Sequence, residues 1–179
     1  MYSHHYPLLL VDGYNIIGAW CSLKNTRDRH GLEQARRELV EALINYTAHK
    51  GYKTQVVFDS QYQKSPCSLE HHSSHLSIYF TAWTQTADTY IEKVCASFFH
   101  GKTAAPPRLI VATSDRDQQL TVVGYGAEWM SAQVLSSDIQ TSFSQVKRKQ
   151  RNSQRSQGRF LFNCLDAKSQ ERLARWRQG

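Results

Sequence analysis

Four aspartates stand where apolar segments of the chain end or where a helical segment begins, and their positions suggest chemistry. Asp12, Asp59 and Asp115 each end or follow an apolar run. Asp88 opens a helix-like stretch. In an open, mostly parallel sheet the carboxyl ends of the strands share one edge, so acids distant in sequence meet there. Magnesium prefers hard oxygen ligands and keeps waters, which suits phosphate chemistry. The pattern therefore predicts a divalent-metal site at a sheet edge.

Further polar side chains accompany two of these acids. Glu92 follows Asp88 by one helical turn, so both carboxylates lie on one side of a helix and can approach one cation. Two solvent-facing acids are the alternative interpretation. Asp117 follows Asp115 by two residues, and two acids beside a strand end exceed what capping the next helix requires. Ser114 is placed to position water or phosphate.

The segment that begins at Asp12 continues with Gly13 and Asn15. Gly13 predicts a tight turn near the ligand, and Asn15 is suited to orient a carboxylate or a metal-bound water. A plain junction between a strand and a turn accounts for the same residues. Asp115 is also a candidate helix cap, and Asp59 either reaches a metal through water or begins a polar loop. These alternatives stay open at the level of the residues.

Strands and helices alternate along the chain. Apolar runs predict strands at residues 8–12, 53–58, 76–80 and 108–113, with a weaker one at 128–130. Helical spacing predicts helices over 32–49, 86–99 and 115–123, and a further helix that Ser131 caps and that runs through Phe143. Such alternation indicates βαβ units. We therefore expect an α/β fold with a central, mostly parallel sheet and helices on both faces.

Positive charge is concentrated at the end of the chain. Residues 146–179 hold ten basic residues against Asp166 and Glu171, a net +8 in a chain of 179 residues whose total is +7. Residues 1–145 are thus expected to form one domain and 146–179 a basic arm. Its 147–158 segment has almost no apolar content and is expected to lack stable structure, whereas 166–176 predicts a terminal helix. Two interpretations explain the arm: a polyanionic partner, or a solvated tail.

Other features mainly exclude classes of protein. No apolar run spans a membrane and no targeting segment is recognisable, so we expect a soluble protein of the cytoplasm or a plastid stroma, with reduced cysteines. Phosphate-binding glycine loops are missing, which argues against nucleoside triphosphatases and dinucleotide enzymes. One cluster has the ligand types of zinc, although an exposed loop is the simpler interpretation. It consists of Cys67, His71, His72 and His75.

Four ordered blocks of the chain resemble a known family. They are Leu-Leu-Val-Asp-Gly-Tyr-Asn-Ile-Ile-Gly-Ala-Trp at 9–20, Val-Val-Phe-Asp at 56–59, Thr-Ala-Asp-Thr-Tyr-Ile-Glu at 86–92 and Val-Ala-Thr-Ser-Asp at 111–115. Together they are similar to the YacP-like branch of the NYN domains, in the PIN-like nuclease superfamily. The resemblance covers about residues 7–145, with a further similarity in the basic terminal helix. It implies a three-layer PIN-like fold and a Mg²⁺- or Mn²⁺-dependent endoribonuclease, which in the bacterial branch cleaves mRNA on the ribosome.

The resemblance also implies roles for individual residues. The main acidic residues of the family match Asp12, Asp88 and Asp115, which would act as catalytic metal ligands. Other positions lining the same pocket match Glu92, Asp117, Asn15 and Asp59. We expect Glu92 and Asp117 to serve as additional ligands, and Asn15, Asp59 and Ser114 to support them. The positions expected to bind RNA are Lys147, Arg148, Lys149, Arg151, Arg155 and Arg159.

One stretch departs from the family. Ala82-Trp83-Thr84-Gln85 stands where a Lys-Glu-Gly-Glu-like stretch often precedes the third block. This difference puts substrate preference in doubt more than metal binding. Trp83 is suited to stack on an unpaired base, or simply packs on the surface. The leading hypothesis is a metal-dependent endoribonuclease, and the alternative is a PIN-like module that binds RNA or the ribosome without cutting. A small-substrate phosphatase ranks last, because Tyr14 occupies the place of a second aspartate.

Overall fold

The computed structural model describes residues 6–60, 66–100 and 107–163, with side chains up to Arg148. Six strands form one sheet in the order β3-β4-β2-β1-β5-β6. Neighbouring strands are parallel except β3, which pairs antiparallel with β4. The strands are β1 (Leu8–Asp12), β2 (Lys53–Phe58), β3 (Ser68–His71), β4 (Leu76–Phe80), β5 (Leu109–Ala112) and β6 (Glu128–Met130).

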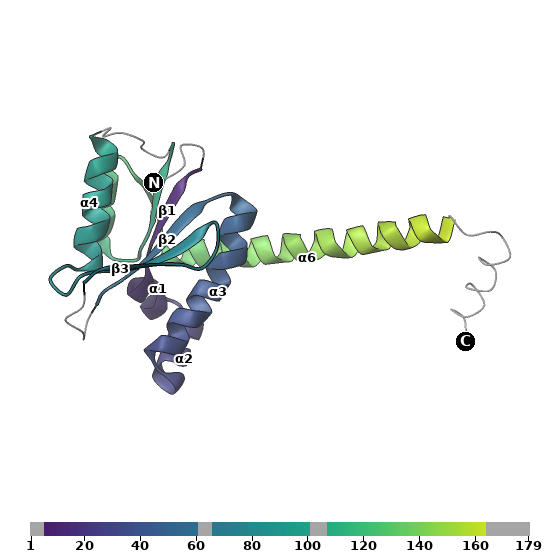
Figure 1. The fold of residues 1–179 in the computed structure, drawn as a ribbon, viewed down its shortest axis with the longest axis horizontal. Helices are drawn as coiled ribbons and strands as arrows, with labels where there is room; N and C mark the ends of the chain where they lie inside the picture. The colour runs from purple at the N-terminus through teal and green to yellow at the C-terminus, as the bar shows by residue number, and fades with distance from the viewer. Residues whose placement is uncertain (1–5, 61–65, 101–106, 164–179) are drawn as a thin grey trace. The chain divides into compact units, whose positions relative to one another are not determined.

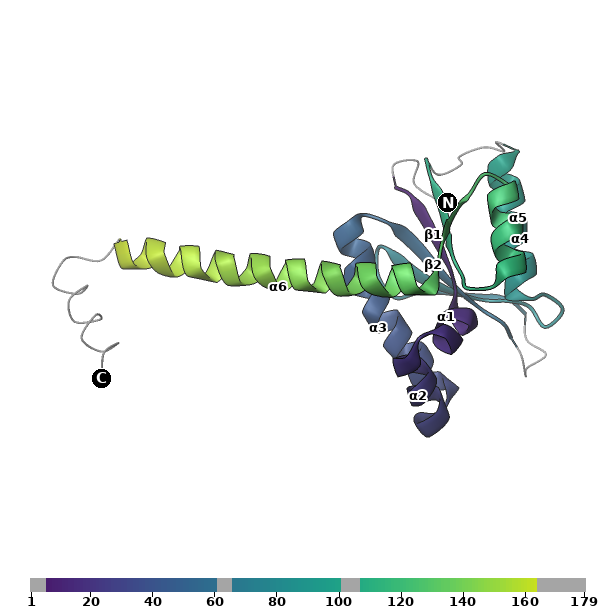
Figure 2. The ribbon, with the colours of Figure 1, turned by 180° about the vertical axis from the view of Figure 1, so that it is seen from behind.

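Helices cover both faces of this sheet (Figures 1 and 2). They are α1 (Gly13–Ala19), α2 (Cys21–His30), α3 (Leu32–Lys50), α4 (Ala87–Phe99), α5 (Arg116–Gly124) and α6 (Ala132–Asn163). The first three and the beginning of α6 pack on one face, and α4 and α5 pack on the other. The expected α/β architecture with three layers is confirmed.

Alternation along β1 explains why there are two cores. Leu9 and Val11 belong to the core beneath α1, α3 and α6, whereas Leu8 and Leu10 belong to the core beneath α4 and α5. Successive side chains of a strand point to opposite faces, so a central strand with helices on both sides must be apolar throughout. All five residues of β1 are buried, including Asp12 at its end.

Some elements differ from the sequence expectations. The turn expected at Gly13 is wrong, because Gly13 is the first residue of α1. A Cβ at this position would lie 2.1 Å from Cε1 of the buried Phe58, so the glycine is required for close packing. The helix α2 and the edge strand β3 were not predicted, and every residue of β3 is exposed.

The chain divides into two compact units, residues 1–140 and 141–179. The helix α6 begins in the first unit and continues to Asn163 in the second. The expectation that residues 147–158 lack stable structure is therefore wrong. Lysine, arginine and glutamine have high helix propensity, and a segment rich in them can extend a helix already nucleated by packing. The terminal helix expected over 166–176 lies outside the described residues.

Two smaller expectations concern metals and membranes. His72 lies 3.6 Å from a carboxylate oxygen of Glu70, and the ring of His75 hydrogen bonds to Ser74. Within the described ranges these histidines and Cys67 form no group of three potential zinc ligands. No helix in that part of the chain is long and apolar enough to cross a bilayer.

Candidate metal centre

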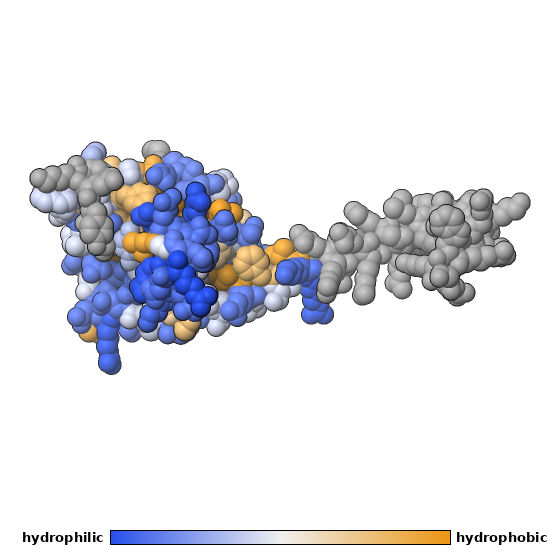
Figure 3. Space-filling model, turned by 90° about the horizontal axis from the view of Figure 1, so that it is seen from below, coloured by the Kyte–Doolittle hydropathy of each residue, from blue (hydrophilic) through white to orange (hydrophobic). Residues whose placement is uncertain are grey.

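Three adjacent strands end at one edge of the sheet, and three of the predicted acids lie at or just after those strand ends. Because β2, β1 and β5 are neighbours and parallel, their carboxyl ends lie together. Asp12 is the last residue of β1, Asp59 directly follows β2, and Asp115 follows β5 after two polar residues. This edge leads into α1, which lies above α2 in Figure 1. Hydrophilic residues predominate on the molecule when it is seen from below, with hydrophobic patches among them (Figure 3).

Asp12 is held by the first turn of α1. Its side chain caps this helix by accepting a hydrogen bond from the backbone N–H of Asn15, at 3.1 Å. Only 7% of the residue is exposed. The Asn15 side chain in turn accepts a hydrogen bond from the backbone N–H of Ser114, at 2.7 Å. Asn15 therefore connects the end of β1 to the loop after β5, which is a supporting position of the kind expected.

Asp115 caps α5, as one of the two sequence interpretations proposed. One of its carboxylate oxygens accepts from the backbone N–H groups of Asp117 and Gln118, at 2.8 and 3.1 Å. Its own N–H donates to the Thr113 hydroxyl, and the Ser114 hydroxyl accepts from the N–H of Ala132. The second carboxylate oxygen of Asp115 takes no part in the cap, so capping and metal binding are compatible.

Asp88 lies in the first turn of α4 and is linked to α5 through a residue that the sequence did not indicate. Gln118 donates a hydrogen bond from Nε2 to Oδ1 of Asp88, at 2.5 Å. Its Oε1 is buried and has no hydrogen-bond partner among the residues that the structure describes. The available signal was helical spacing, because Gln118 precedes the buried Val122 by four residues and so shares its inward face.

Asp59 has a defined structural task. Its side chain accepts a hydrogen bond from the backbone N–H of Ala87, the first residue of α4. Thr86 caps the same helix by accepting from the N–H of Thr89. Asp59 therefore fixes the start of α4, and with it Asp88, relative to the end of β2.

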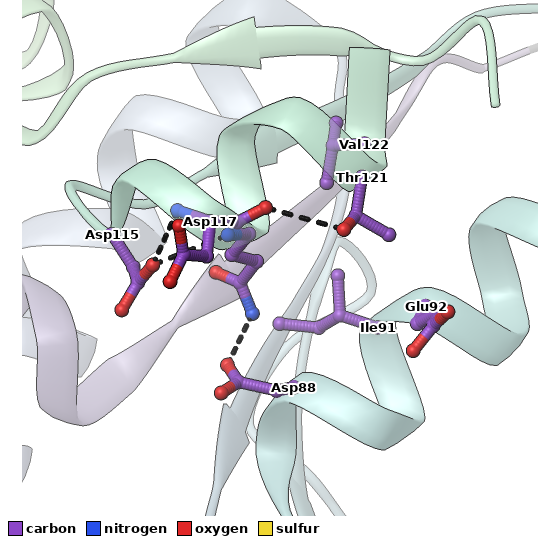
Figure 4. A pocket seen from close by; sticks show the side chains of 8 residues that line it. Asp88, Ile91, Glu92, Asp115, Asp117, Thr121 and Val122 are labelled. Atoms are coloured by element: carbon purple, nitrogen blue, oxygen red, sulfur yellow. Dashed lines mark hydrogen bonds between the residues drawn. The ribbon is translucent and has the colours of Figure 1, made fainter. Parts of the chain in front are cut away.

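A pocket of about 240 Å³ opens between α4 and α5. Its acidic lining comprises Asp88, Glu92, Asp115 and Asp117, and Gln118 contributes an amide. Asp115 and Asp117 project from the start of α5 and Asp88 from the start of α4, while Glu92 lies beyond Ile91 (Figure 4). The pocket thus unites two predicted ligands with the two predicted additional ones. Asp12, Asn15 and Asp59 stand outside its lining.

Electrostatics nevertheless couple Asp12 to the pocket acids. Burial raises the pKa of Asp12 to about 7, and repulsion from Asp88, Asp59 and Asp115 adds to that rise, against the Asn15 hydrogen bond. Burial also raises the pKa of Asp88, with repulsion from Asp115 and Asp59 acting in the same direction. These four aspartates therefore lie within electrostatic reach of one another, in an arrangement that a nearby cation would stabilise.

Comparison with known proteins identifies the family of the chain. A family model described as the YacP-like NYN domain matches residues 9–178. The chain belongs to the YacP-like NYN domain family. The resemblance drawn from the sequence is thereby confirmed, and the domain is of a nuclease type.

Relatives of this NYN domain come from Bacillus subtilis. The uncharacterized protein YacP of strain 168 is 32% identical over 174 residues, which are 96% of this chain and 97% of that protein. The crystal structure of Rae1 (YacP) is 30% identical, with a TM-score of 0.66 over 96% of this chain and 95% of that one. A mutant of Rae1 gives 28% identity and a TM-score of 0.67, over 93% of this chain and 98% of that one.

Nuclease-type NYN domains generally use divalent metal ions, and the donors of this chain fit such an ion. Carboxylate oxygens predominate, and the buried Oε1 of Gln118 is a further hard acceptor to which no described residue donates. Within the described ranges, however, no three His, Cys, Asp or Glu side chains already surround one point closely enough to hold a metal. Magnesium retains several waters, so one or two direct carboxylates suffice for it.

The basic residues expected to contact RNA lie on α6. Lys147 and Arg148 are exposed. The remaining four belong to the helical backbone, but their side chains lie outside the described part of the structure. Their role therefore stays a prediction for this NYN protein.

Proposed function

We propose that this protein is a metal-dependent endoribonuclease that hydrolyses RNA phosphodiester bonds with Mg²⁺ or Mn²⁺. The observation that carries the proposal is the convergence of Asp12, Asp59, Asp88 and Asp115 at one sheet edge. Burial raises the pKa of Asp12 and Asp88, and repulsion from the other aspartates adds to both rises. Perturbed acids that gather beside a pocket are typical of functional sites. Asp12, Asp88 and Asp115 would hold the metal, with Glu92 and Asp117 as additional ligands from the same pocket.

Asn15 and Gln118 position the carboxylates that would hold the metal. A bound divalent ion would supply Lewis acidity and lower the pKa of the attacking water. Asn15 keeps Asp12 and the Ser114 loop in register, through the two hydrogen bonds described above. Gln118 orients the carboxylate of Asp88. Because Asp115 commits one oxygen to capping α5, its second oxygen is the one available to the metal.

The substrate class follows from charge. A cluster of ten basic residues within 146–179 favours a polyanion, because lysine and arginine release counterions from phosphates. Lys147 and Arg148 are exposed as such contacts require. The family resemblance extends the proposal to mRNA, with the ribosome as a second partner.

A second candidate function is a module that binds RNA or the ribosome without cutting. The observation that favours it is the absence, within the described ranges, of an assembled group of three metal ligands. The stretch at residues 82–85, which departs from the family pattern, also favours it. Both candidates predict RNA binding, so only cleavage distinguishes them.

The test substitutes Asp12→Asn and Asp88→Asn in the full chain. We expect each variant to lose Mn²⁺-dependent cleavage of a labelled RNA by at least about 100-fold, with RNA affinity largely unchanged. Asp28→Asn is the matched control, because Asp28 is exposed on α2 and its partner among the described residues is the adjacent Arg27. Full activity in both site variants would refute the metal assignment. Inactive wild-type protein that still binds RNA would favour the module.

A further inference from the structure

A half-buried arginine lies over aromatic rings at the edge of the sheet that carries the acids. Arg36 of α3 donates a hydrogen bond from Nη1 to the Tyr14 hydroxyl, at 3.2 Å. Its Cζ lies 5.9 Å from the ring centre of Phe58 and 5.7 Å from that of Phe80. The two rings stack on each other, with centroids 5.8 Å apart. The guanidinium thus has a fixed position.

Strand register places this arginine at the same edge of the sheet as the candidate metal centre, with its aromatic partners on the face of α1 to α3 and the acid pocket on the face of α4 and α5. Phe58 and Phe80 are paired residues at the carboxyl ends of β2 and β4, and Asp12 pairs with the residue preceding Phe58. Tyr14 follows Asp12 by two residues, and its ring centre lies 5.0 Å from that of Phe58. Parallel strands end at one edge, so Arg36 and Asp12 share that edge.

The charge of Arg36 has no counterpart in the described part of the chain. None of the ion pairs found there involves Arg36, and the Tyr14 hydroxyl is its one hydrogen-bond partner there. The aromatic contacts satisfy the face of the guanidinium but not its remaining N–H groups. The Arg36 guanidinium is planar, and the Phe58 and Phe80 rings hold it in place. Its remaining N–H donors are suited to bind a phosphate with two hydrogen bonds.

We propose that Arg36, fixed by Tyr14 and by the Phe58 and Phe80 rings, binds a phosphate of the RNA backbone where the bound strand passes over this edge of the sheet. This inference rests on the proposed function and extends it, because it gives the substrate a direction from the acid pocket across the ends of β1, β2 and β4. Arg36 is then a substrate-binding residue. Contacts to phosphate carry no sequence information, so it increases affinity for every RNA sequence alike.

Binding is best measured without cleavage. The full chain, in EDTA, is titrated into a labelled single-stranded RNA oligonucleotide at several salt concentrations. We expect Arg36→Gln to weaken binding about tenfold at low salt and to reduce the slope of log K against log salt by about 1. The matched control is Arg37→Gln, which removes the same charge from the adjacent, exposed position of α3. It should change both quantities much less.

A second variant separates phosphate binding from packing. Arg36→Met retains an apolar stem over Phe58 and Phe80 but removes the charge, so its thermal midpoint should stay near that of the wild type while affinity falls as in Arg36→Gln. Wild-type affinity in Arg36→Met, or equal effects of Arg36→Gln and Arg37→Gln, would overturn the inference. If the nuclease proposal fails instead, the wild type does not cleave, yet the difference between Arg36 and Arg37 variants persists.

Discussion

The Gln118 amide donates a 2.5 Å hydrogen bond to Asp88, while its own oxygen is buried and finds no hydrogen-bond partner in the described part of the chain. The orientation of this amide follows from charge, because the opposite orientation would place its oxygen against an anionic carboxylate. A buried acceptor without a donor costs about 1–3 kcal/mol. Gln118 therefore resembles a ligand-orienting residue more than a stabilising one.

Gln118→Leu should separate stability from metal binding. The substitution removes the acceptor that lacks a partner, so we expect the free energy of unfolding to stay within about 1 kcal/mol of wild type. Asp88 would lose its orienting donor, and we expect Mn²⁺ affinity to fall about 10- to 100-fold. Calorimetric titration of Mn²⁺ and urea unfolding measure the two effects. Gln119→Leu, on the adjacent and less buried residue, should leave Mn²⁺ affinity unchanged. Equal Mn²⁺ binding by both variants would contradict the role assigned to Gln118.

Asp12 should make the protein less stable as the pH rises. Its folded pKa, about 7, lies above the ordinary value of 3.8, so the folded state binds this proton more tightly than the unfolded state. Ionisation therefore removes stability progressively between about pH 4 and pH 7. This difference of about three in pKa corresponds to a loss of roughly 4 kcal/mol in the free energy of unfolding at most. We expect Asp12→Asn to exceed the wild type in stability at pH 7.5 and to lose most of that advantage near pH 4.

Divalent metal ions should offset the loss of stability that ionisation of Asp12 causes. In urea unfolding at pH 7.5, added Mn²⁺ should stabilise the wild type, because the ion binds the folded carboxylates and not the unfolded chain. It should have little effect on Asp12→Asn. A pH-independent difference between the two proteins would show that ionisation of Asp12 does not destabilise the fold. Equal stabilisation of both by Mn²⁺ would show that Asp12 is not a metal ligand.

Much of the fold could be predicted because its strands are short apolar runs, separated by segments whose apolar residues recur at helical spacing. Residues 8–12, 53–58, 76–80 and 128–130 form strands with the predicted bounds. A buried parallel sheet imposes this pattern, since its strands need apolar residues on both faces. The acids at the strand ends followed from the same rule.

The remaining features depend on tertiary contacts that no local pattern encodes. Gln118 is adjacent to a similar glutamine, and only packing shows which of the two reaches Asp88. Gly13 looks like a turn residue until Phe58 is placed against it. The edge strand β3 is exposed and carries little apolar signal. Charge in residues 147–158 suggested disorder, but helix propensity and continuation from a packed helix prevailed.

Tyr46 of α3 donates a hydrogen bond to Asp138 of α6 at 2.9 Å, and Lys50 pairs with the same carboxylate at 2.7 Å. Burial pushes the pKa of Asp138 upward, but the Lys50 and Tyr46 hydrogen bonds outweigh it and the pKa is lowered. The resulting stability is present above the unfolded pKa and is lost as the pH falls through the folded pKa. We expect Asp138→Asn to cost about 1 kcal/mol at pH 7 and almost nothing near pH 2. Urea unfolding at both pH values checks this, and a constant cost would contradict it.

Gly13 and Gly18, both in α1, should respond oppositely to alanine. A methyl group at Gly13 would meet the buried Phe58 ring, whereas no atom of the described residues lies within 4 Å of the corresponding position at Gly18. We expect Gly13→Ala to lower the free energy of unfolding by about 1–3 kcal/mol through overpacking. Gly18→Ala should raise it by up to about 1 kcal/mol, because alanine favours the helix. Urea unfolding of both variants measures the difference. Because Gly13 lies between Asp12 and Tyr14, Gly13→Ala should also lose cleavage. Adding Phe58→Leu to the Gly13→Ala chain should recover part of the lost stability, because it removes the ring that the new methyl group meets. Equal stability of the two alanine variants would mean that α1 does not pack closely against β2.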